Sequence, residues 1–310
     1  MTTINPVDTI INGPRDDTFK NLIVSLLRRG KMATKYIDQI LDEDGMDLYS
    51  KAFTHPTADE SNNYEFYEMM GDASVNCAIV WYLNRKFTHL HCPGGVKIIA
   101  RLKINLVSKR TFGPLAEKLG LWPFVTASKE TKDTQMKQTL EDVFEAFFGV
   151  TQTLIDNNIK MGRGSAIIYN MIESIYDEHI PISLKYEDLF DAKTRLKETF
   201  DFPNFKDILT ELTYHREKNM EEKMNTVTIT ARIRGHVQQI GIGKGPLKPT
   251  AEQNAARNAI YNLRNKGYKR PIPERFREFC ESDEPQLVKA IMPGSSRGRG
   301  GGGGGGGGGN

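Results

Sequence analysis

Three acidic side chains lie close together in the stretch from Asn63 to Ala73. Glu65, Glu68 and Asp72 are spaced at i, i+3 and i+7, so an α-helix would place all three on one face. Like charges at this spacing repel one another, and a divalent cation would offset the repulsion because hard cations prefer carboxylate oxygens. The residues between the acids would form the opposite, buried face, with Phe66, Met69 and Met70. A solvated acidic face without a metal explains this spacing equally well.

A second acidic pair lies between Thr139 and Gly149, in a stretch that is otherwise almost wholly apolar. Asp142 and Glu145 are at i and i+3, again on one helical face. The opposite side carries Leu140, Val143, Phe144, Phe147 and Phe148. Acidic side chains are rarely buried unless they are paired or bound to a metal. This pair therefore favours a metal site over a solvated face for both clusters.

Nearly every element that positions these acids is predicted to be helical. Apolar residues recur at helical spacing from residue 19 to residue 181, so we predict one all-α domain over 19–181. Residues 1–18 are polar and contain Pro6, Gly13 and Pro14, which favours a flexible N-terminal arm. His89, His91 and Cys92 could ligate zinc, but no second pair of ligands follows at the expected spacing, so an ordinary loop is the better interpretation.

The pattern changes after Pro181, and residues 187–268 predict a small α+β domain of order α-β-β-β-α. A short helix over 191–200 precedes three strands, in which Val227, Ile229, Ala231 and Ile233 alternate with polar residues, and a helix follows over 250–264. Between Lys223 and Tyr268 there are eight Lys or Arg against one acid, Glu252. This imbalance predicts a face that binds phosphate backbone, although a solvated basic surface is the simpler alternative. The glycines from Gly241 to Gly245 lack the spacing of a nucleotide-binding loop.

The rest of the chain narrows the class of protein. Residues 269–310 are charged and then run into glycines, so they predict a basic, glycine-rich disordered tail. Three scattered cysteines give no disulfide framework or zinc ribbon, which favours a reducing compartment. We see no signal peptide and no apolar run long enough to span a membrane. We therefore expect an intracellular and cytoplasmic protein with no membrane partner.

Three segments together resemble the ribonuclease III family. The stretch Asn63 to Asp72 (NYEFYEMMGD) resembles the family signature N-x-R-L-E-F-L-G-D and follows a T-H-P-T segment that begins at Thr54. Residues 141–149 (EDVFEAFFG) resemble the second acidic motif, A-D-x-x-E-A-L-I-G. Residues 187–268 resemble a double-stranded-RNA-binding domain. The order and spacing match the bacterial type of enzyme, in which one nuclease domain precedes one RNA-binding domain.

The resemblance implies a function and a set of site residues. It makes Glu68, Asp72, Asp142 and Glu145 the catalytic, metal-binding residues, with Glu65 in a supporting role. The implied cofactor is Mg²⁺, for which Mn²⁺ can substitute, and the implied activity is metal-assisted hydrolysis of double-stranded RNA to 5′-phosphate and 3′-hydroxyl ends. The family works as a homodimer. A non-catalytic double-stranded-RNA-binding protein on the same fold is the alternative.

The expected RNA contacts come partly from the resemblance and partly from charge. Thr194 and Glu198 match minor-groove positions of the first helix of the RNA-binding domain, and Arg234, Lys244 and Lys248 are the expected cations. The chain departs from the family pattern in this domain. Residues 216–223 replace the usual G-x-x-H loop, and residues 247–251 degrade the usual K-K-x-A-K start of the last helix. We expect weakened RNA binding, and such divergence would suit a large DNA virus, in which case the compartment is the host cytoplasm.

Overall fold

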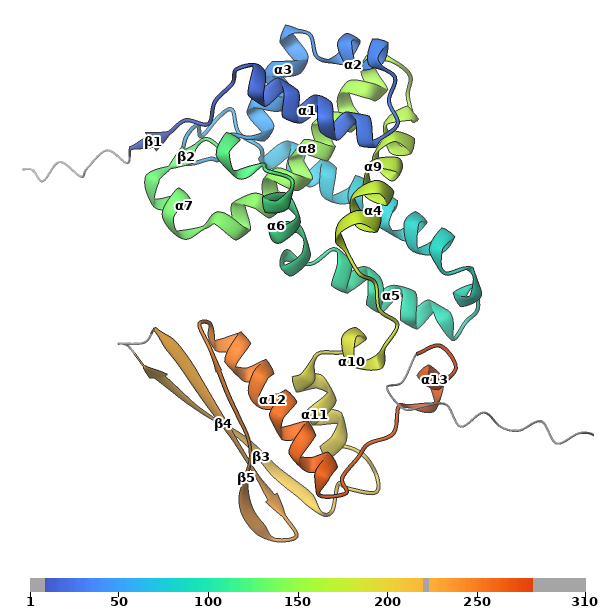
Figure 1. Cartoon of the computed structure of the whole chain (residues 1–310), viewed down its shortest axis with the longest axis vertical. Helices are drawn as coiled ribbons and strands as arrows, with labels where there is room; N and C mark the ends of the chain where they lie inside the picture. Colours follow the sequence, from blue (N-terminus) through green and yellow to red (C-terminus); the bar gives the residue numbers. More distant parts are fainter. Residues whose placement is uncertain (1–8, 220–222, 281–310) are drawn as a thin grey trace, which may run out of the picture.

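Helices make up almost all of the first part of the chain, as the apolar periodicity predicts. The computed structural model describes residues 9–219 and 223–280. Figure 1 shows a larger helical part above a smaller part built on one sheet. The elements of the larger part, in chain order, are β1 (Ile10–Ile11), α1 (Asp17–Arg29), α2 (Thr34–Ile40), α3 (Glu43–Ala52), α4 (Glu65–Lys86), η1 (Thr88–Leu90), α5 (Gly95–Leu106), α6 (Lys109–Lys118), η2 (Trp122–Phe124), β2 (Ala127–Ser128), α7 (Lys129–Thr134), α8 (Met136–Asn158) and α9 (Arg163–His179).

The core of the helical part is organised around α8, which crosses α4. Every residue from Val143 to Thr151 is buried, so α8 is covered on all sides along this stretch. The two helices come unusually close at a pair of glycines. A Cβ on Gly71 would lie 1.7 Å from the carbonyl oxygen of Glu145, and a Cβ on Gly149 would lie 2.1 Å from that of Tyr67. Both glycines are thus required by backbone contact, and this contact sets the acids of α4 beside those of α8.

The smaller part is a three-stranded antiparallel sheet with helices on one face (Figure 1). Its elements are α11 (Ala192–Phe200), β3 (Leu209–Asn219), β4 (Met224–Ile233), β5 (His236–Gly245) and α12 (Lys248–Asn265). A short helix, α10 (Tyr186–Leu189), precedes α11 and packs on the larger core. Alternate residues of β4 are buried, as a half-buried strand requires. On β5, a Cβ at Gly243 would lie 2.1 Å from the backbone nitrogen of Ala255, so this glycine serves helix packing and not nucleotide binding. The predicted fold class, an all-α domain followed by a small α+β domain, is confirmed.

The flexible arm predicted for residues 1–18 does not hold for its described residues. Ile10 and Ile11 pair with β2, and α1 already begins at Asp17. The Arg15 guanidinium donates a hydrogen bond of 2.7 Å to the carbonyl oxygen of Phe124 and one of 2.8 Å to the hydroxyl of Ser50. Local composition hid this arrangement because the partners of the segment lie far along the chain. Residues 1–8 lie outside the described part.

The tail predicted for residues 269–310 is likewise wrong for residues 269–280. This segment runs from the end of α12 back toward the helical part and forms a short helix, α13 (Glu274–Arg277), near α10 and α5 (Figure 1). Phe276 and Cys280 are buried in the larger core at 4% and 6% exposure. Ordering a charged segment costs conformational entropy, and the burial of these two side chains offsets that cost. The glycine run lies outside the described residues.

One face of α4 also differs from the prediction. Phe66 and Met69, expected in the buried face, are 59% and 64% exposed, and the buried stripe of α4 instead runs through Gly71, Val75 and Ile79. Within residues 9–219 and 223–280, no helix is both long enough and apolar enough to cross a membrane.

Candidate active site

The four predicted acids lie around the crossing of α4 and α8, near enough for their charges to act on one another. Glu145 is buried at 8% exposure, Glu68 and Asp142 are half-buried, and Asp72 is exposed at the rim. The close approach of the two backbones at Gly71 and Gly149 holds these side chains in one group. Each pair lies on its own helix, Glu68 and Asp72 on α4 and Asp142 and Glu145 on α8, and the crossing brings the two helices together.

Electrostatic repulsion within the group is strong. Burial, together with the charges of Asp72, Glu141, Glu68 and Asp142, raises the pKa of Glu145 to about 8. Burial, together with the charges of Asp142 and Glu65, raises the pKa of Glu68 to about 7. Carboxyl groups with such pKa values resist ionisation because each sits in low dielectric beside like charges. Perturbed carboxyl groups that cluster in this way are typical of functional sites.

The two aspartates each have a neutral hydrogen-bond donor. The hydroxyl of Tyr64 donates to Oδ2 of Asp142 over 2.9 Å. The side-chain amide of Asn76 donates to Oδ1 of Asp72 over 2.5 Å. Burial raises the pKa of Asp142, and the bond from Tyr64 opposes that rise because it stabilises the ionised form.

Two charged residues at the site were not among the predicted site residues. Glu141 is buried at 7% exposure, and its Oε2 has no hydrogen bond of good geometry although Nζ of Lys109 lies 3.2 Å away. Burial raises the pKa of the Glu141 carboxyl, and Lys109 opposes that rise. Lys109, the first residue of α6, thus brings a cation to the edge of the acidic group. The only available signal was the position of Glu141 beside Asp142.

Glu65 and His55 lie on the Tyr64 side of the group. Glu65 is exposed, and its charge raises the pKa values of Glu68 and Tyr64, which fits a peripheral role. The His55 ring lies edge-on to Tyr64 at 5.6 Å, and Nδ1 accepts a hydrogen bond from the backbone of Thr57. Burial lowers the pKa of His55, so the neutral imidazole is favoured.

The donor set fits a hard divalent cation by its chemistry and not as a preformed cage. Over residues 9–219 and 223–280, no group of three or more His, Cys, Asp or Glu side chains is already arranged to hold a metal ion. That finding also covers His89, His91 and Cys92. The carboxylates at the helix crossing nevertheless act on one another's ionisation, and oxygen donors of this kind are those that Mg²⁺ and Mn²⁺ take.

Comparison with known proteins identifies the family. The model of the ribonuclease III domain matches residues 65–152, which include all five predicted acids. A protein of Invertebrate iridescent virus 6 that is named as a ribonuclease 3 is 36% identical over 280 residues, covering 86% of this chain and 94% of the viral protein. The chain belongs to the ribonuclease III family.

Further relatives extend the comparison. A protein of Frog virus 3 (isolate Goorha), also named as a ribonuclease 3, is 33% identical over 257 residues; the match covers 82% of this chain and 63% of that protein. The solved nuclease domain of ribonuclease III from Campylobacter jejuni is 22% identical, with a TM-score of 0.39, over 52% of this chain and 98% of that one. The family makes this chain a ribonuclease III-type endoribonuclease.

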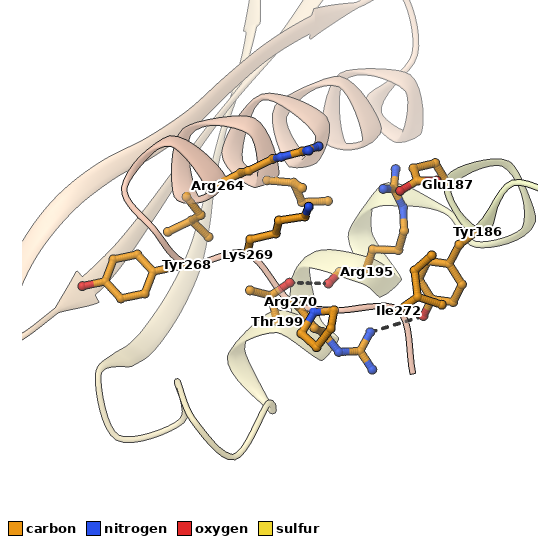
Figure 2. Close-up of a pocket in the computed structure, with 12 residues that line it drawn as sticks. Tyr186, Glu187, Arg195, Thr199, Arg264, Tyr268, Lys269, Arg270 and Ile272 are labelled. Atoms are coloured by element: carbon orange, nitrogen blue, oxygen red, sulfur yellow. Dashed lines mark hydrogen bonds between the residues drawn. The ribbon is translucent and has the colours of Figure 1, made fainter. Parts of the chain in front are cut away.

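Two of the residues predicted to contact RNA form polar contacts within the protein. The Thr194 hydroxyl donates to Oδ2 of Asp191 over 2.6 Å, at the N-terminus of α11. Glu198 accepts a hydrogen bond of 2.8 Å from the hydroxyl of Tyr186 and forms an ion pair with Arg270. Figure 2 shows Tyr186 and Arg270 converging at a pocket of about 80 Å³ beside α11. Glu198 therefore joins the RNA-binding part to the segments on either side of it.

The three predicted cations do not form one patch. Lys244 and Lys248 are exposed on either side of the turn from β5 to α12. Arg234 is exposed at the other end of the sheet, where the chain turns from β4 into β5 with a φ of 48°. A strand of this length spans roughly 30 Å, so Arg234 is too far from the two lysines to share a phosphate with them. The start of α12 instead lies beside that of α11, because Gln253 bonds to both Asp191 and Ala192.

Proposed function

We propose that this endoribonuclease hydrolyses double-stranded RNA with a divalent cation, Mg²⁺ or in its place Mn²⁺, held by Glu68, Asp72, Asp142 and Glu145. The products would carry 5′-phosphate and 3′-hydroxyl ends. One observation carries the proposal: acids from two helices gather at a buried backbone crossing, where burial and mutual repulsion raise the pKa of Glu145 to about 8. A cluster that is costly to ionise needs a positive partner, and a divalent cation supplies the charge with oxygen ligation.

The charged side chains have different roles at the site. Glu145 and Asp142, on the buried helix, provide fixed ligands, and Glu68 and Asp72 close the group from α4. When bound, the cation would activate a water and neutralise charge that develops on the phosphodiester. Lys109, 3.2 Å from Glu141, limits the net negative charge that an incoming RNA backbone would meet. Glu65, exposed beside Glu68, supports the placement of substrate from the rim.

The RNA-binding part would hold the duplex through the starting ends of α11 and α12. Lys244 and Lys248 are exposed there, and the N-terminus of an 18-residue helix favours anionic phosphate. Thr194 lies at the same end, whereas Glu198 and Arg234 do not. We therefore assign the RNA face to Thr194, Lys244 and Lys248. Double-stranded RNA is read by shape and 2′-hydroxyl contacts, so little sequence preference is expected.

We further propose that the protein works as a homodimer through the exposed apolar stripe of α4. Phe66, Met69, Val80 and Trp81 are 59%, 64%, 42% and 55% exposed. Trp81 also lines a hollow of about 620 Å³ between α4 and α9. Large apolar side chains gathered on one face are typical of protein interfaces. A second copy covering this stripe would lie directly beside the acidic group.

The functional units follow from the two separate cores. We propose residues 19–181 as the catalytic domain and 187–268 as the RNA-binding domain. Leu196, Val227 and Ala255 belong to the smaller core, whereas Tyr186 and Phe276 belong to the larger one. The described parts of residues 1–18 and 269–310 therefore add to the catalytic domain.

Cleavage of long double-stranded RNA with and without Mg²⁺ tests the proposal. Asp142→Asn and Asp72→Asn should reduce cleavage by at least 100-fold, while filter binding to the same RNA is retained. Glu173→Gln is a matched control, because Glu173 lies on α9 and pairs with Lys31 at 3.6 Å. Undiminished cleavage by both aspartate variants would refute the site. Binding without cleavage by the wild type at any metal concentration would instead indicate a non-catalytic RNA-binding protein.

A further inference from the structure

Tyr64 connects the acidic groups of the two helices. Its side chain is buried at 3% exposure, and its hydroxyl donates to Oδ2 of Asp142, 78 residues away on α8. Its own carbonyl oxygen accepts the backbone N–H of Glu68 over 2.9 Å, which starts the first turn of α4. One residue thus touches a proposed ligand on α8 through its side chain and one on α4 through its backbone.

The position of the Tyr64 ring is closely determined by its neighbours. The Tyr64 backbone N–H donates to the carbonyl oxygen of Thr54 over 3.1 Å. Oδ1 of Asn63 caps the backbone N–H of Glu65, while its amide holds the preceding loop through the carbonyl oxygen of Asp59. The His55 ring packs edge-on against the phenol at an interplanar angle of 85°. The phenol is therefore fixed from the backbone, from the loop and from one ring face.

The hydrogen bond from Tyr64 fixes the orientation of the Asp142 carboxylate. The hydroxyl donates to Oδ2 and so restrains rotation of the carboxylate, which keeps its oxygens in one orientation for a cation. A phenol is protonated at neutral pH and donates one hydrogen bond, which stabilises the ionised carboxylate. Asp72 has a comparable donor, Asn76, but that bond lies within one helix, four residues along. Of these two bonds, the one from Tyr64 connects the start of α4 with a proposed ligand on α8.

We propose that Tyr64 is a positioning residue that orients Asp142 for the divalent cation and so sets the affinity of the site for the metal. This inference rests on the proposed function, because it needs Asp142 to be a ligand. Groups that orient a metal ligand typically change metal affinity 10–100-fold when they are removed. Removal of the Tyr64 hydroxyl should produce a loss of that size.

Mn²⁺ binding to the RNA-free protein, measured by calorimetry and by the electron paramagnetic resonance of free Mn²⁺, tests the role of Tyr64. Tyr64→Phe should weaken Mn²⁺ binding about 10–100-fold, while cleavage at saturating Mn²⁺ recovers most of the wild-type rate. Tyr82→Phe is the matched control, because the Tyr82 hydroxyl donates to Oδ1 of Asp177 over 2.7 Å, on α9. Tyr82→Phe should bind Mn²⁺ as the wild type does.

A double-variant comparison separates positioning from general support of the fold. If Tyr64 acts through Asp142, Tyr64→Phe should cause no further loss of Mn²⁺ affinity in an Asp142→Asn background. Equal Mn²⁺ affinity of wild type and Tyr64→Phe, or additive losses in the double variant, overturns the inference. Absence of Mn²⁺ binding by the wild type would overturn the proposed function as well, so the two failures are distinguishable. Should Tyr64→Phe fold poorly, the shift of its melting temperature by Mn²⁺ reports affinity for the folded fraction, and a shift equal to that of the wild type overturns the inference.

Discussion

Replacing Glu145 with glutamine should stabilise the metal-free protein at neutral pH while it abolishes cleavage. Burial and neighbouring acids raise the pKa of Glu145 from 4.5 to about 8. Between these values the folded state binds more protons than the unfolded state, so this carboxyl makes stability fall as pH rises through that window. At pH 7.5 the loss is on the order of 4 kcal/mol, from 1.36 kcal/mol for each pKa unit. Glutamine has nearly the same shape and carries no charge, so it should avoid the loss.

Urea denaturation in the presence of a chelator, at pH 5 and pH 7.5, measures this effect. The variant and the wild type should differ little at pH 5, and the variant should be the more stable one at pH 7.5. A gain of a few kcal/mol corresponds to roughly 10 °C in melting temperature for a domain of this size. Adding Mg²⁺ should then stabilise the wild type but not Glu145→Gln, because ligand binding to the folded state raises stability.

Two results would refute the reasoning. If Glu145→Gln and wild type differ by the same amount at both pH values, the carboxyl does not carry the electrostatic cost that its surroundings indicate. If Mg²⁺ stabilises both proteins equally, Glu145 does not contribute to a metal site. Asp156→Asn is a useful control, because Asp156 lies later on α8 and accepts the backbone N–H of Gly164 over 2.7 Å.

Three further predictions concern the elements that hold the site and the RNA-binding part. Gly149→Ala should cost more than about 2 kcal/mol and reduce cleavage, because its Cβ would lie 2.1 Å from the carbonyl oxygen of Tyr67; an unchanged melting temperature would contradict this. Phe276→Ala should lower the free energy of unfolding by about 3 kcal/mol and make residues 269–280 sensitive to limited proteolysis. The reason is that the ring centroids of Phe276 and Phe190 lie 5.1 Å apart. Unchanged protease resistance would argue against a docked segment. Glu252→Gln should lower the free energy of unfolding of the RNA-binding part by about 1–3 kcal/mol at pH 7, because Lys193 and Arg216 hold the pKa of that carboxyl below its ordinary value. That contribution is present above the unfolded-state pKa of 4.5 and is lost as pH falls through the lower folded pKa. Equal stability of the Glu252 variant and wild type at pH 7 would refute it.

The sequence pattern alone was sufficient to predict the features that depend on residues close together in the chain. The acids of α4 and the acids of α8 could each be assigned to one helical face, because positions three, four and seven apart share a face. The alternation of buried and exposed residues on β4 was visible for the same reason. The order of helices followed by a small sheet likewise follows from periodicities that can be counted along the chain.

Composition failed at the two ends of the folded region. The segment around Arg15 and the segment around Phe276 contain many charged or turn-forming residues, which favour disorder when they are considered alone. Each is held by partners far away in the chain: Arg15 by Phe124, and Phe276 by Tyr186 and Phe190. Burial of a few side chains outweighs composition in such segments, and their burial depends on surfaces that other elements provide.

The acidic site itself shows what the sequence determined and what the tertiary structure decided. Spacing identified acids that share a helical face, and the resemblance to one family selected Glu68, Asp72, Asp142 and Glu145 among them as site residues. Neighbours on a helix point about 100° apart, so spacing could not show that Glu141 joins Asp142 in the group. The hydroxyl of Tyr64 on Asp142 and the ammonium of Lys109 near Glu141 also come from other elements. Their placement depends on how closely α4 approaches α8 at Gly71 and Gly149, and that distance exists only in the folded chain.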